Sequence, residues 1–357
     1  IFTGCVSKNK TIYNSILDGE LVENDKNGNF INYFLCFDIY ILNNKNIMAF
    51  PFVQMEGLDY PAKMDKTIFR YPLMDKTING LELVSITGGE NIPLTIKSKK
   101  FYKNTSENIF SQCNQILSKI DNEEFIYETD GLIFTPINMG VGSITIGKKL
   151  DLNKSLKKTW FNSFKWKPPE FNTVDFLVTI KKDERKKDIV NSRFNEGESL
   201  QKQEQIIKFK TMELRVGFDE RNERHGFLNP FEDIIQDKDP KDDNTINTYR
   251  AVPFQPTNPT PTFPIYKCNI YLNSENKMLI ENGTESFEDK TIVEFKFDET
   301  KPKYWQWIPI RVRNDKTSDY RKGLKNFGNA YHVANSVWKS IHNPVTEIMI
   351  RTGQNIP

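Results

Sequence analysis

Cysteine is scarce in this sequence, and the four that occur lie far apart. Cys5, Cys36, Cys113 and Cys268 share no metal-binding spacing and no disulfide framework, a usage typical of a reducing compartment. We expect them to be small core hydrophobes. The three histidines show no ligand spacing, and no Gly-rich cofactor loop is present. The sequence therefore favours neither a disulfide-stapled fold nor a His/Cys metal centre.

Long apolar runs are also missing. No uninterrupted span approaches the roughly 20 residues that a membrane helix needs, and the N-terminus lacks the order of a signal peptide. The formal net charge of +2 leaves the choice of an anionic partner to local clusters. A length of 357 residues predicts two domains or one large one. Because the sequence also lacks an initiator Met, we expect it to be a piece of a longer chain.

The first half of the chain predicts a mixed α and β body. Residues 12–42 contain two aromatic-rich β segments separated by the turn "NDKNGN". The clearest helix is predicted over 106–120, behind a cap at Thr105 or Ser106. Its apolar residues recur at helical spacing and predict a core face: Ile109, Phe110, Cys113, Ile116, Leu117 and Ile120.

The character of the sequence changes after Lys167. "KKDERKKD" (181–188) is typical of a solvated turn or insertion, and the proline-dense 252–264 predicts an extended segment over a surface. "TIVEFKFD" and "WQWIPIRVR" alternate as strands do. The pattern predicts a mixed body before about residue 175 and a mostly β module to about 320. A tail follows, with a helix whose apolar positions begin at Ala330 and end at Ile341.

Two segments carry basic residues at the period of a strand. In "KWKP", Lys165 and Lys167 point to one face and Trp166 to the other. Two ammonium groups on one face repel each other, so this arrangement favours an anion between them. "RVRNDK" repeats the pattern with Arg311 and Arg313 on one face, followed by the close pair Asp315 and Lys316. A solvated edge strand explains either pair alone about as well as a phosphate site does.

Further short segments line up with these in a fixed order. "ILDGELV" (16–22) places two acidic residues beside a glycine, and "FLCFDIYIL" (34–42) places Phe37 before Asp38. "TDGLIF" (129–134) sets Asp130 and a glycine before an apolar strand. Each segment alone is weak, because an acid-glycine pair is often a simple β-turn.

Taken together, the segments resemble the motifs of mRNA capping guanylyltransferases, a family of the covalent nucleotidyltransferases that also include ATP-dependent ligases. "LDGEL", "FDI", "TDGLIF", "KWKPPEFNTVDF" and "WIPIRVRNDK" match the family's third, third-a, fourth, fifth and sixth motifs, over residues 16–317. The Trp-Lys-Pro form followed by "NTVDF" favours guanylyltransferases over ligases. The nearest resemblance is to the large-DNA-virus type, in which one polypeptide also carries a cap methyltransferase.

The resemblance implies an α+β fold class. It implies a nucleotidyltransferase domain of the ATP-grasp-like, ligase type with antiparallel sheets over 1–175, and a β-rich OB-fold domain over 176–320 with an insertion at about 181–262. Residues 321–357 would be a linker and helix toward a C-terminal methyltransferase domain.

The resemblance also implies roles for single residues. Asp130 would hold a divalent metal, Mg²⁺ or Mn²⁺, near the α-phosphate of the substrate GTP, and Glu20 would bind that metal or the ribose of the nucleotide. Phe37 would stack on the guanine, with core packing as an equal alternative. Lys165 and Lys167 would grip the α-phosphate. On an OB-fold lid that closes over the site, Arg311, Asp315 and Lys316 would orient the pyrophosphate, and Arg313 would join them in binding the nucleotide.

One family motif is missing. The nucleophile of the family is the lysine of a Lys-x-Asp-Gly motif, which occurs nowhere in this sequence. We expect it to precede Ile1 in the parent protein; a non-catalytic nucleotide- or RNA-binding relative and an ATP-dependent polynucleotide ligase are the alternatives. The implied partners are 5′-diphosphate RNA and GTP, with fused triphosphatase and methyltransferase domains and no membrane. The expected location is cytoplasmic, or a viral factory or virion if the protein is viral.

Overall fold

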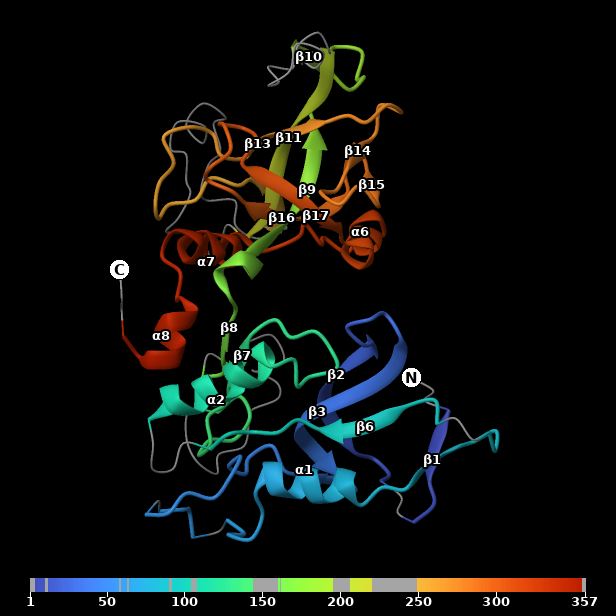
Figure 1. Ribbon diagram of the computed structural model, residues 1–357, viewed down its shortest axis with the longest axis vertical. Coiled ribbons are helices and arrows are strands. Elements are labelled where there is room, and N and C mark those ends of the chain that lie inside the picture. The colour runs from blue at the N-terminus through green and yellow to red at the C-terminus, as the bar shows by residue number, and fades with distance from the viewer. Residues whose placement is uncertain are drawn as a thin grey trace, which may run out of the picture. The chain divides into compact units, whose positions relative to one another are not determined.

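The computed structural model describes residues 4–9, 12–57, 59–62, 64–89, 92–103, 108–143, 160, 162–194, 206–219 and 249–354. The chain divides into two compact units, shown in Figure 1. The first unit holds residues 1–167 and 347–357, and the second holds 168–346. The division falls between Lys167 and Pro168, shortly before the boundary expected near residue 175.

The first unit is built on a small sheet with one helix on one face. Its described strands and helices are β1 (Cys5–Ser7), β2 (Ile16–Asn24), β3 (Phe30–Leu42), β4 (Lys45–Asn46), α1 (Arg70–Asn79), β5 (Leu83–Ser85), β6 (Thr95–Ser98), α2 (Ile109–Asp121), β7 (Leu132–Phe134), β8 (Phe164–Trp166) and α8 (Glu347–Thr352). β2 and β3 form the antiparallel hairpin that the aromatic-rich segments predicted, and the predicted turn joins them. β6 lies parallel to β3 on its other side.

Helix α1 covers one face of this sheet, where β3 and β6 present apolar residues to it. Cys36 and Ile39 of β3 pack with Met74 and Ile78 of α1, and all four are buried. On β6, the Ser98 hydroxyl donates a hydrogen bond to Asp75 of α1. Lys97 and Lys99 alternate with Ile96 and Ser98 and therefore point to the opposite face.

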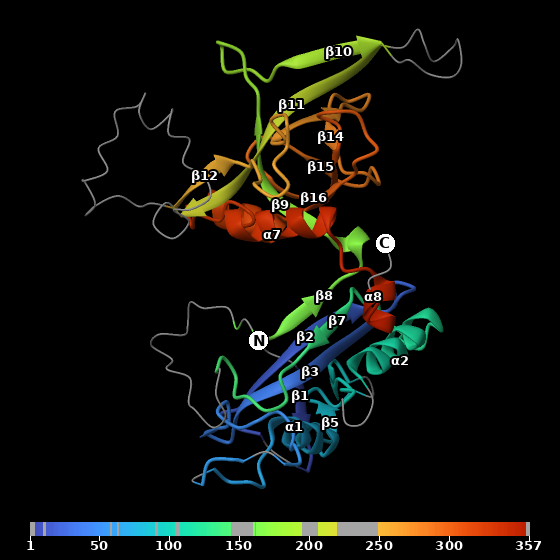
Figure 2. The same ribbon diagram turned by 90° about the vertical axis from the view of Figure 1, so that its left-hand side faces the viewer.

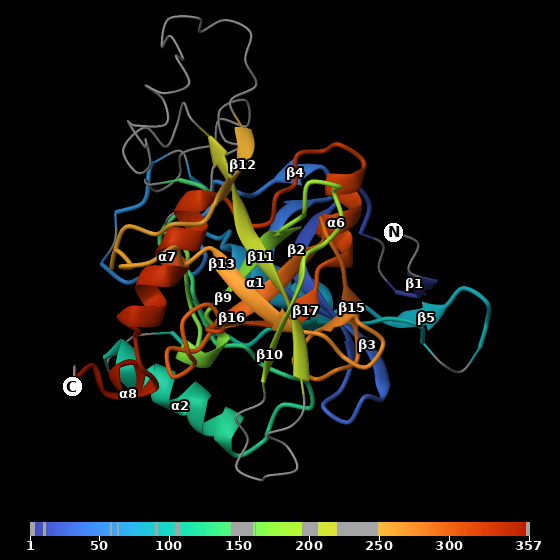
Figure 3. The same ribbon diagram turned by 90° about the horizontal axis from the view of Figure 1, so that it is seen from above.

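The predicted helix is α2. Cys113 and Leu117 are buried, Ile116 and Ile120 pack beside them, and only Ile109 of the predicted core face is largely exposed. Thr105 and Ser106, the predicted caps, lie outside the described residues; the helix is capped by Asn108, whose side chain accepts a 3.0 Å hydrogen bond from Ser111 N. Figure 3 shows α8 beside α2, where Arg351 donates to Asp121 at 2.6 Å.

The second unit is organised around the long central strand β11. Its described elements are η1 (Pro169–Phe171), β9 (Thr173–Ile180), β10 (Val190–Phe194), β11 (Ile206–Asp219), β12 (Tyr249–Pro253), β13 (Lys267–Tyr271), β14 (Met278–Leu279), β15 (Ser286–Phe287), β16 (Ile292–Phe297), β17 (Trp307–Val312), α6 (Asn314–Arg321) and α7 (Tyr331–His342). The strand order β10-β11-β9-β16-β17 is antiparallel throughout, and β12 and β13 also pair with β11.

Two parts of this unit differ from the sequence expectation. The predicted insertion at 181–262 includes β11, which places Met212, Leu214 and Val216 in the centre of the core. The rest of that range is only partly described, and His225 is not among the described residues. The predicted linker at 321–357 includes α7, which lies along β9 and β11 in Figure 2 and buries Tyr331, Ala334 and Trp338. A helix that buries its apolar face in this way is part of the domain.

Three of the four cysteines are buried, as expected of core hydrophobes, and Cys5 is half-buried. No disulfide joins cysteines in the described structure. Within the described ranges, no helix has the length and apolar character required to cross a bilayer.

The packing of α7 can be tested at Trp338. Its side chain is 3 % exposed, and its indole N–H donates a 2.8 Å hydrogen bond to Pro259 O. Trp338→Ala is expected to lower the free energy of unfolding by about 3–5 kcal/mol, as truncation of a core tryptophan does. Lys339→Ala, on the exposed side of the same helix, should change it by less than about 0.5 kcal/mol. Urea unfolding measures both, and equal stability of the two variants would show that α7 is not part of the core.

Candidate functional site

The ribbon of β7 and β8 depends on the glycine that follows Asp130. Gly131 has φ +141, and a Cβ added there would lie 1.9 Å from the carbonyl oxygen of Trp166. Only glycine therefore allows the two strands to approach this closely. Leu132 lies opposite Trp166 in the antiparallel register, so the residues flanking these strands are brought together as well.

Asp130 and Lys167 form an ion pair at the end of this ribbon. Lys167 Nζ lies 2.7 Å from Asp130 Oδ2, and both side chains are largely exposed. Partial burial raises the pKa of the Asp130 carboxyl, but its bond to Lys167 and the charges of Lys167 and Lys99 outweigh that effect. The pKa therefore lies below its usual value, and Asp130 is an anion at neutral pH.

Lys165 in β8 and Lys167 directly after it lie on the exposed face, as strand alternation predicts. Trp166 between them is 7 % exposed and packs on Leu132, Cys113 and Leu117. Lys165, opposite Ile133, and Lys167 are exposed. The buried tryptophan thus anchors the strand while both ammonium groups remain accessible to an anion.

A second group of charges lies on the face of the β2-β3-β6 sheet that α1 does not cover. Lys99 Nζ lies 3.5 Å from Glu20 Oε2. Lys97 lies over the ring of Tyr33, with its Nζ 4.0 Å from the ring centroid. Because Lys99 pairs with Glu20 and its charge also lowers the pKa of Asp130, Glu20, Lys99, Asp130 and Lys167 belong to one electrostatic cluster.

Phe37 lies at an irregularity of the β2–β3 hairpin. Asp18 pairs with Asp38 and Gly19 with Cys36, so Phe37 is the extra residue of a β-bulge. A bulge redirects a side chain from the regular alternation. Phe37 is half-buried, and among the described residues it does not belong to the buried clusters of this unit.

The residue after Phe37 is fixed by a buried ion pair. Asp38 accepts two hydrogen bonds from Arg70, at 2.8 Å from Nε and 3.0 Å from Nη2, and the Arg70 side chain is fully buried. Arg70 also donates to the carbonyl oxygens of Phe50 and Met139. The position of Phe37 is therefore set from inside the unit.

The carboxylates suit a magnesium ion of the kind that nucleotide sites use. Mg²⁺ prefers hard oxygen ligands, keeps several waters and is commonly held by one or two carboxylates together with substrate phosphates. Asp130 and Glu20 are accessible carboxylates of one cluster and can supply that number. In the described part of the chain, no group of three or more His, Cys, Asp or Glu side chains forms an all-protein metal cage.

The predicted site residues of the second unit meet around a carboxylate that the sequence analysis did not single out. Asp175, in "NTVDF", accepts from Arg313 Nη1 and from Lys316 Nζ, both at 2.6 Å. Arg313 also binds Asp315, whose Oδ2 lies 3.1 Å from Nη2, and these bonds hold the pKa of Asp315 below its usual value. Asp315 thus pairs with Arg313 and not with Lys316.

Arg311 and Arg313 bind carboxylates that lie side by side on one face of the sheet, since Glu294 is directly opposite Asp175 in the register of β16 and β9. β17 ends at Val312, and Arg313 is the residue that precedes the first turn of α6. Arg311, opposite Glu294 in the register of β16 and β17, binds that carboxylate, with Nη2 and Oε2 2.6 Å apart. Val312 between the two arginines is buried, so Arg311 and Arg313 share a face as their spacing predicted, although Arg313 lies one residue beyond the strand.

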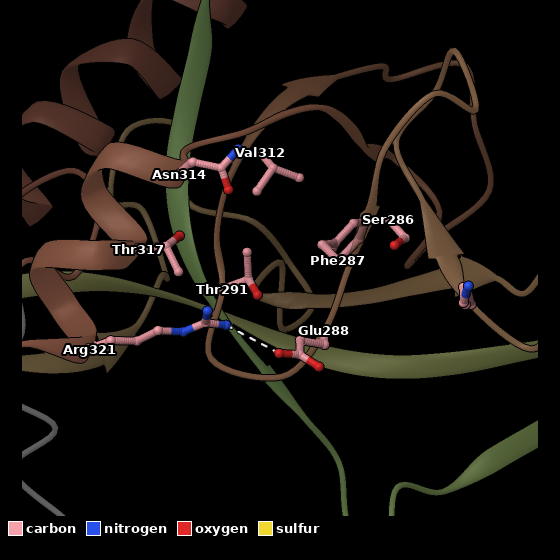
Figure 4. A pocket seen from close by; sticks show the side chains of 9 residues that line it. Ser286, Phe287, Glu288, Thr291, Val312, Asn314, Thr317 and Arg321 are labelled. Carbon is pink, nitrogen blue, oxygen red and sulfur yellow. Dashed lines mark hydrogen bonds and ion pairs between the residues drawn. The ribbon is translucent and has the colours of Figure 1, made fainter.

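A pocket of about 320 Å³ adjoins α6 (Figure 4). Its walls include Thr291, Val312, Asn314 and Thr317, and Arg321 closes one side through its 3.2 Å bond to Glu288. None of the predicted site residues lines it. The pocket therefore lies beside the charged group around Asp175 and is not part of it.

Sequence reasoning missed Lys99, Asp175 and Arg70 as site residues. Lys97 and Lys99 in "TIKSKK" show the same alternation as Lys165 and Lys167, so that signal was present. For Arg70 and Asp175 no local signal exists, because each acts through a partner distant in the sequence.

The groups on the first unit (two accessible carboxylates, exposed lysines and a ring at a bulge) suit a ligand that carries phosphate and an aromatic base.

Comparison with known proteins points to the same class of ligand. Residues 236–350 match the family model for the C-terminal domain of mRNA capping enzymes. The chain is 31% identical over 232 residues to a probable mRNA-capping enzyme of Acanthamoeba polyphaga mimivirus, over 64% of this chain and 16% of that protein.

The chain is also 24% identical over 343 residues to the mRNA-capping enzyme of Mus musculus, over 94% of this chain and 37% of that protein. It therefore spans well under half of either relative. These matches confirm the resemblance to the mRNA capping enzymes that the ordered motifs predicted.

The role of Gly131 can be tested with a matched glycine. Gly28 also has positive φ, +82, but a Cβ there would have nothing within 4 Å. Gly28→Ala is therefore expected to cost only the backbone strain, about 1–2 kcal/mol. Gly131→Ala must in addition separate β7 from β8, so it should lower the thermal midpoint further. If the two variants melt at the same temperature, close approach of the strands is not the reason for Gly131.

Proposed function

We propose that this chain carries the nucleotide-binding and phosphate-binding part of an mRNA capping guanylyltransferase. That activity transfers GMP from GTP, through a lysyl-GMP intermediate, to the 5′-diphosphate end of RNA. The observation that carries the proposal is the β7–β8 ribbon: it presents Lys165 and Lys167 on one face, with Lys167 bound to Asp130, within the motifs that resemble this family. The similarity to capping enzymes supports it.

In this proposal the first unit is a nucleotidyltransferase domain and the second an OB-fold domain, and the parent is a multifunctional, viral-type enzyme with fused triphosphatase and methyltransferase domains. The all-antiparallel sheet of the second unit and the match over 236–350 support the assignment of the second domain. The similarity to a mimivirus protein supports the viral type.

Each residue of the first unit has a role that its environment supports. Lys165 and Lys167 bind the α-phosphate, because two exposed ammonium groups on one face attract an anion. Asp130 and Glu20 hold a divalent cation, which would neutralise phosphate charge. Phe37 stacks on the guanine. A nucleophilic lysine near Lys165 and Lys167 would have a lowered pKa, since neighbouring positive charge disfavours its protonated form.

The roles of Arg311, Arg313, Asp315 and Lys316 stay predictions. Each of the three cations already binds a carboxylate, Glu294, Asp175 or Asp315. An incoming pyrophosphate would have to replace at least one of these partners. Arg311 is the most accessible of the three cations and is the one expected to exchange Glu294 for the anion.

The proposed function is tested by equilibrium binding of GTP and ATP in the presence of Mg²⁺. The chain is expected to bind GTP more tightly than ATP. Hydrogen bonds to charged groups contribute about 1.5–3 kcal/mol each, so Lys165→Ala/Lys167→Ala should weaken GTP binding by about 100-fold or more. Lys119→Ala, at an exposed lysine of α2, is the control and should bind normally.

Two outcomes of that experiment are decisive. Tighter binding of ATP would favour a polynucleotide ligase. Equal GTP affinity of the double variant and the wild type would remove the phosphate role from Lys165 and Lys167. Unchanged melting of the double variant is expected, because exposed ion pairs such as Asp130–Lys167 contribute at most about 1 kcal/mol.

Phe37→Leu separates stacking from packing. Leucine keeps most of the apolar volume but removes the ring, and stacking contributes about 1–3 kcal/mol per base. GTP affinity should fall by about 5- to 150-fold with little change in stability. Phe30→Leu on the same strand, 73% exposed, should leave both unchanged. Normal GTP affinity together with a lower melting temperature for Phe37→Leu would instead identify Phe37 as a core residue.

A further inference from the structure

One face of the β10-β11-β13 sheet is half-exposed and rich in aromatic and cationic side chains. Along β11, buried Met212, Leu214 and Val216 alternate with half-buried residues on the opposite face, so this strand has a core side and an outer side. The antiparallel register places Tyr271 of β13 opposite Phe209 and Arg193 of β10 opposite Ile207 on the outer side.

Three aromatic rings meet on this outer side. Tyr271 and Trp305 are stacked, with centroids 4.2 Å apart and planes 27° apart, and Phe209 meets Trp305 edge-on at 5.2 Å. The Arg193 guanidinium lies 4.8 Å from the Trp305 centroid and 5.1 Å from that of Tyr271. Tyr271 is 40% exposed although it lies on a sheet face, where packing would normally bury a large ring.

Charge and polar groups around the rings are complementary to a polyanion. Residues 181–194, which include Arg193, contain six Lys or Arg and three Asp or Glu. Of the three acids, Asp188 is already bound by Lys210 at 2.9 Å and by Lys182 at 3.5 Å. On the outer side itself, Lys267 lies opposite Glu213, and Arg215 binds Glu213 at 2.7 Å. Asn191 lies opposite Phe209 and Asn269 opposite Thr211, so amides flank the rings on both neighbouring strands.

We propose that this outer face, centred on Arg193, Tyr271 and Trp305, binds single-stranded RNA. Rings give bases a stacking surface, amides can bond base edges, and Arg193 with the surrounding lysines contacts phosphates. An acidic protein would form ion pairs with the cations but would make no specific contact with the exposed rings and amides. A duplex would keep its bases stacked on one another and could not occupy the rings.

The ligand class rests on the proposed function, in which RNA is the acceptor of GMP. The face itself is distinct from the nucleotide site: none of Lys165, Lys167, Asp130, Glu20 and Phe37 belongs to β10, β11 or β13. It would hold the RNA body while the 5′ end reacts elsewhere, and the two sites can be tested separately.

The test is equilibrium binding of a labelled RNA of about 12 nucleotides, within the roughly 4–16 nucleotide range of single-strand sites. The RNA carries a 5′-hydroxyl and no GTP is added, so the nucleotide site takes no part. Tyr271→Leu is expected to bind about 5- to 100-fold more weakly with an unchanged dependence on salt. Arg193→Gln should also bind more weakly, and its slope of log affinity against log salt should fall by about 0.7, the value for one single-strand phosphate contact.

Arg321→Ala, an exposed arginine of the same unit on α6, is the control and should bind RNA as the wild type does. Thermal melting of each variant shows whether it is folded. Because Arg193 is exposed, Arg193→Gln is expected to stay folded, and it tests RNA binding by this face even if Tyr271→Leu is unstable. Wild-type affinity and salt slope of Arg193→Gln would overturn the proposal. Equal competition by poly-glutamate or by duplex RNA would overturn it as well.

The binding measurements distinguish a failure of the RNA face from a failure of the nucleotide site. Lys165→Ala/Lys167→Ala should keep its affinity for the 5′-hydroxyl RNA while losing GTP. Normal GTP binding by Arg193→Gln, together with unchanged RNA binding, would remove the RNA face and leave the nucleotide site in place.

Discussion

The buried ion pair of Asp38 and Arg70 is the contact on which the first unit depends. Arg70 joins the start of α1 to β3 through both carboxylate oxygens of Asp38, and to two loops through the carbonyl oxygens of Phe50 and Met139. A buried pair costs desolvation when it forms, yet removing one partner alone leaves an uncompensated charge and typically costs about 3–5 kcal/mol. Because Asp38 follows Phe37 directly, the same pair fixes the bulge from which Phe37 projects. The accessible ring of the site is thus positioned by a charge that solvent does not reach.

The second unit uses a buried carboxylate in a comparable way. Asp175 gathers Arg313 and Lys316, and its backbone N–H donates to Asn329 at 2.7 Å, which joins β9 to the segment before α7. In both units a carboxylate with little exposure organises groups that come from distant parts of the chain. The accessible charges, Lys165, Lys167 and Arg311, lie outside these centres and can therefore change partners without disturbing the fold.

Much of this architecture could be predicted from local patterns. Helical spacing identified α2, period-two alternation identified β16 and β17, and the alternation in "KWKP" placed Trp166 inside with both lysines outside. The patterns failed where the surroundings of a segment decide its role. β11 was assigned to an insertion because the charged residues around it hide its buried face. The tail was expected to be a linker, since nothing in its own sequence shows what its apolar face meets.

The sequence by itself determined the order of the motifs, the family they resemble, and the face to which side chains point along regular strands such as β8. These depend on neighbouring residues and on fixed periods of the backbone, which do not require the rest of the chain. Only the tertiary structure decided which charges pair: Asp130 with Lys167, Glu20 with Lys99, and Asp315 with Arg313 instead of Lys316. It also decided that Arg193, Tyr271 and Trp305 share one face. Ion pairs and ring contacts form over a few ångströms between residues that lie far apart in the sequence, and the folded backbone alone brings them within that range.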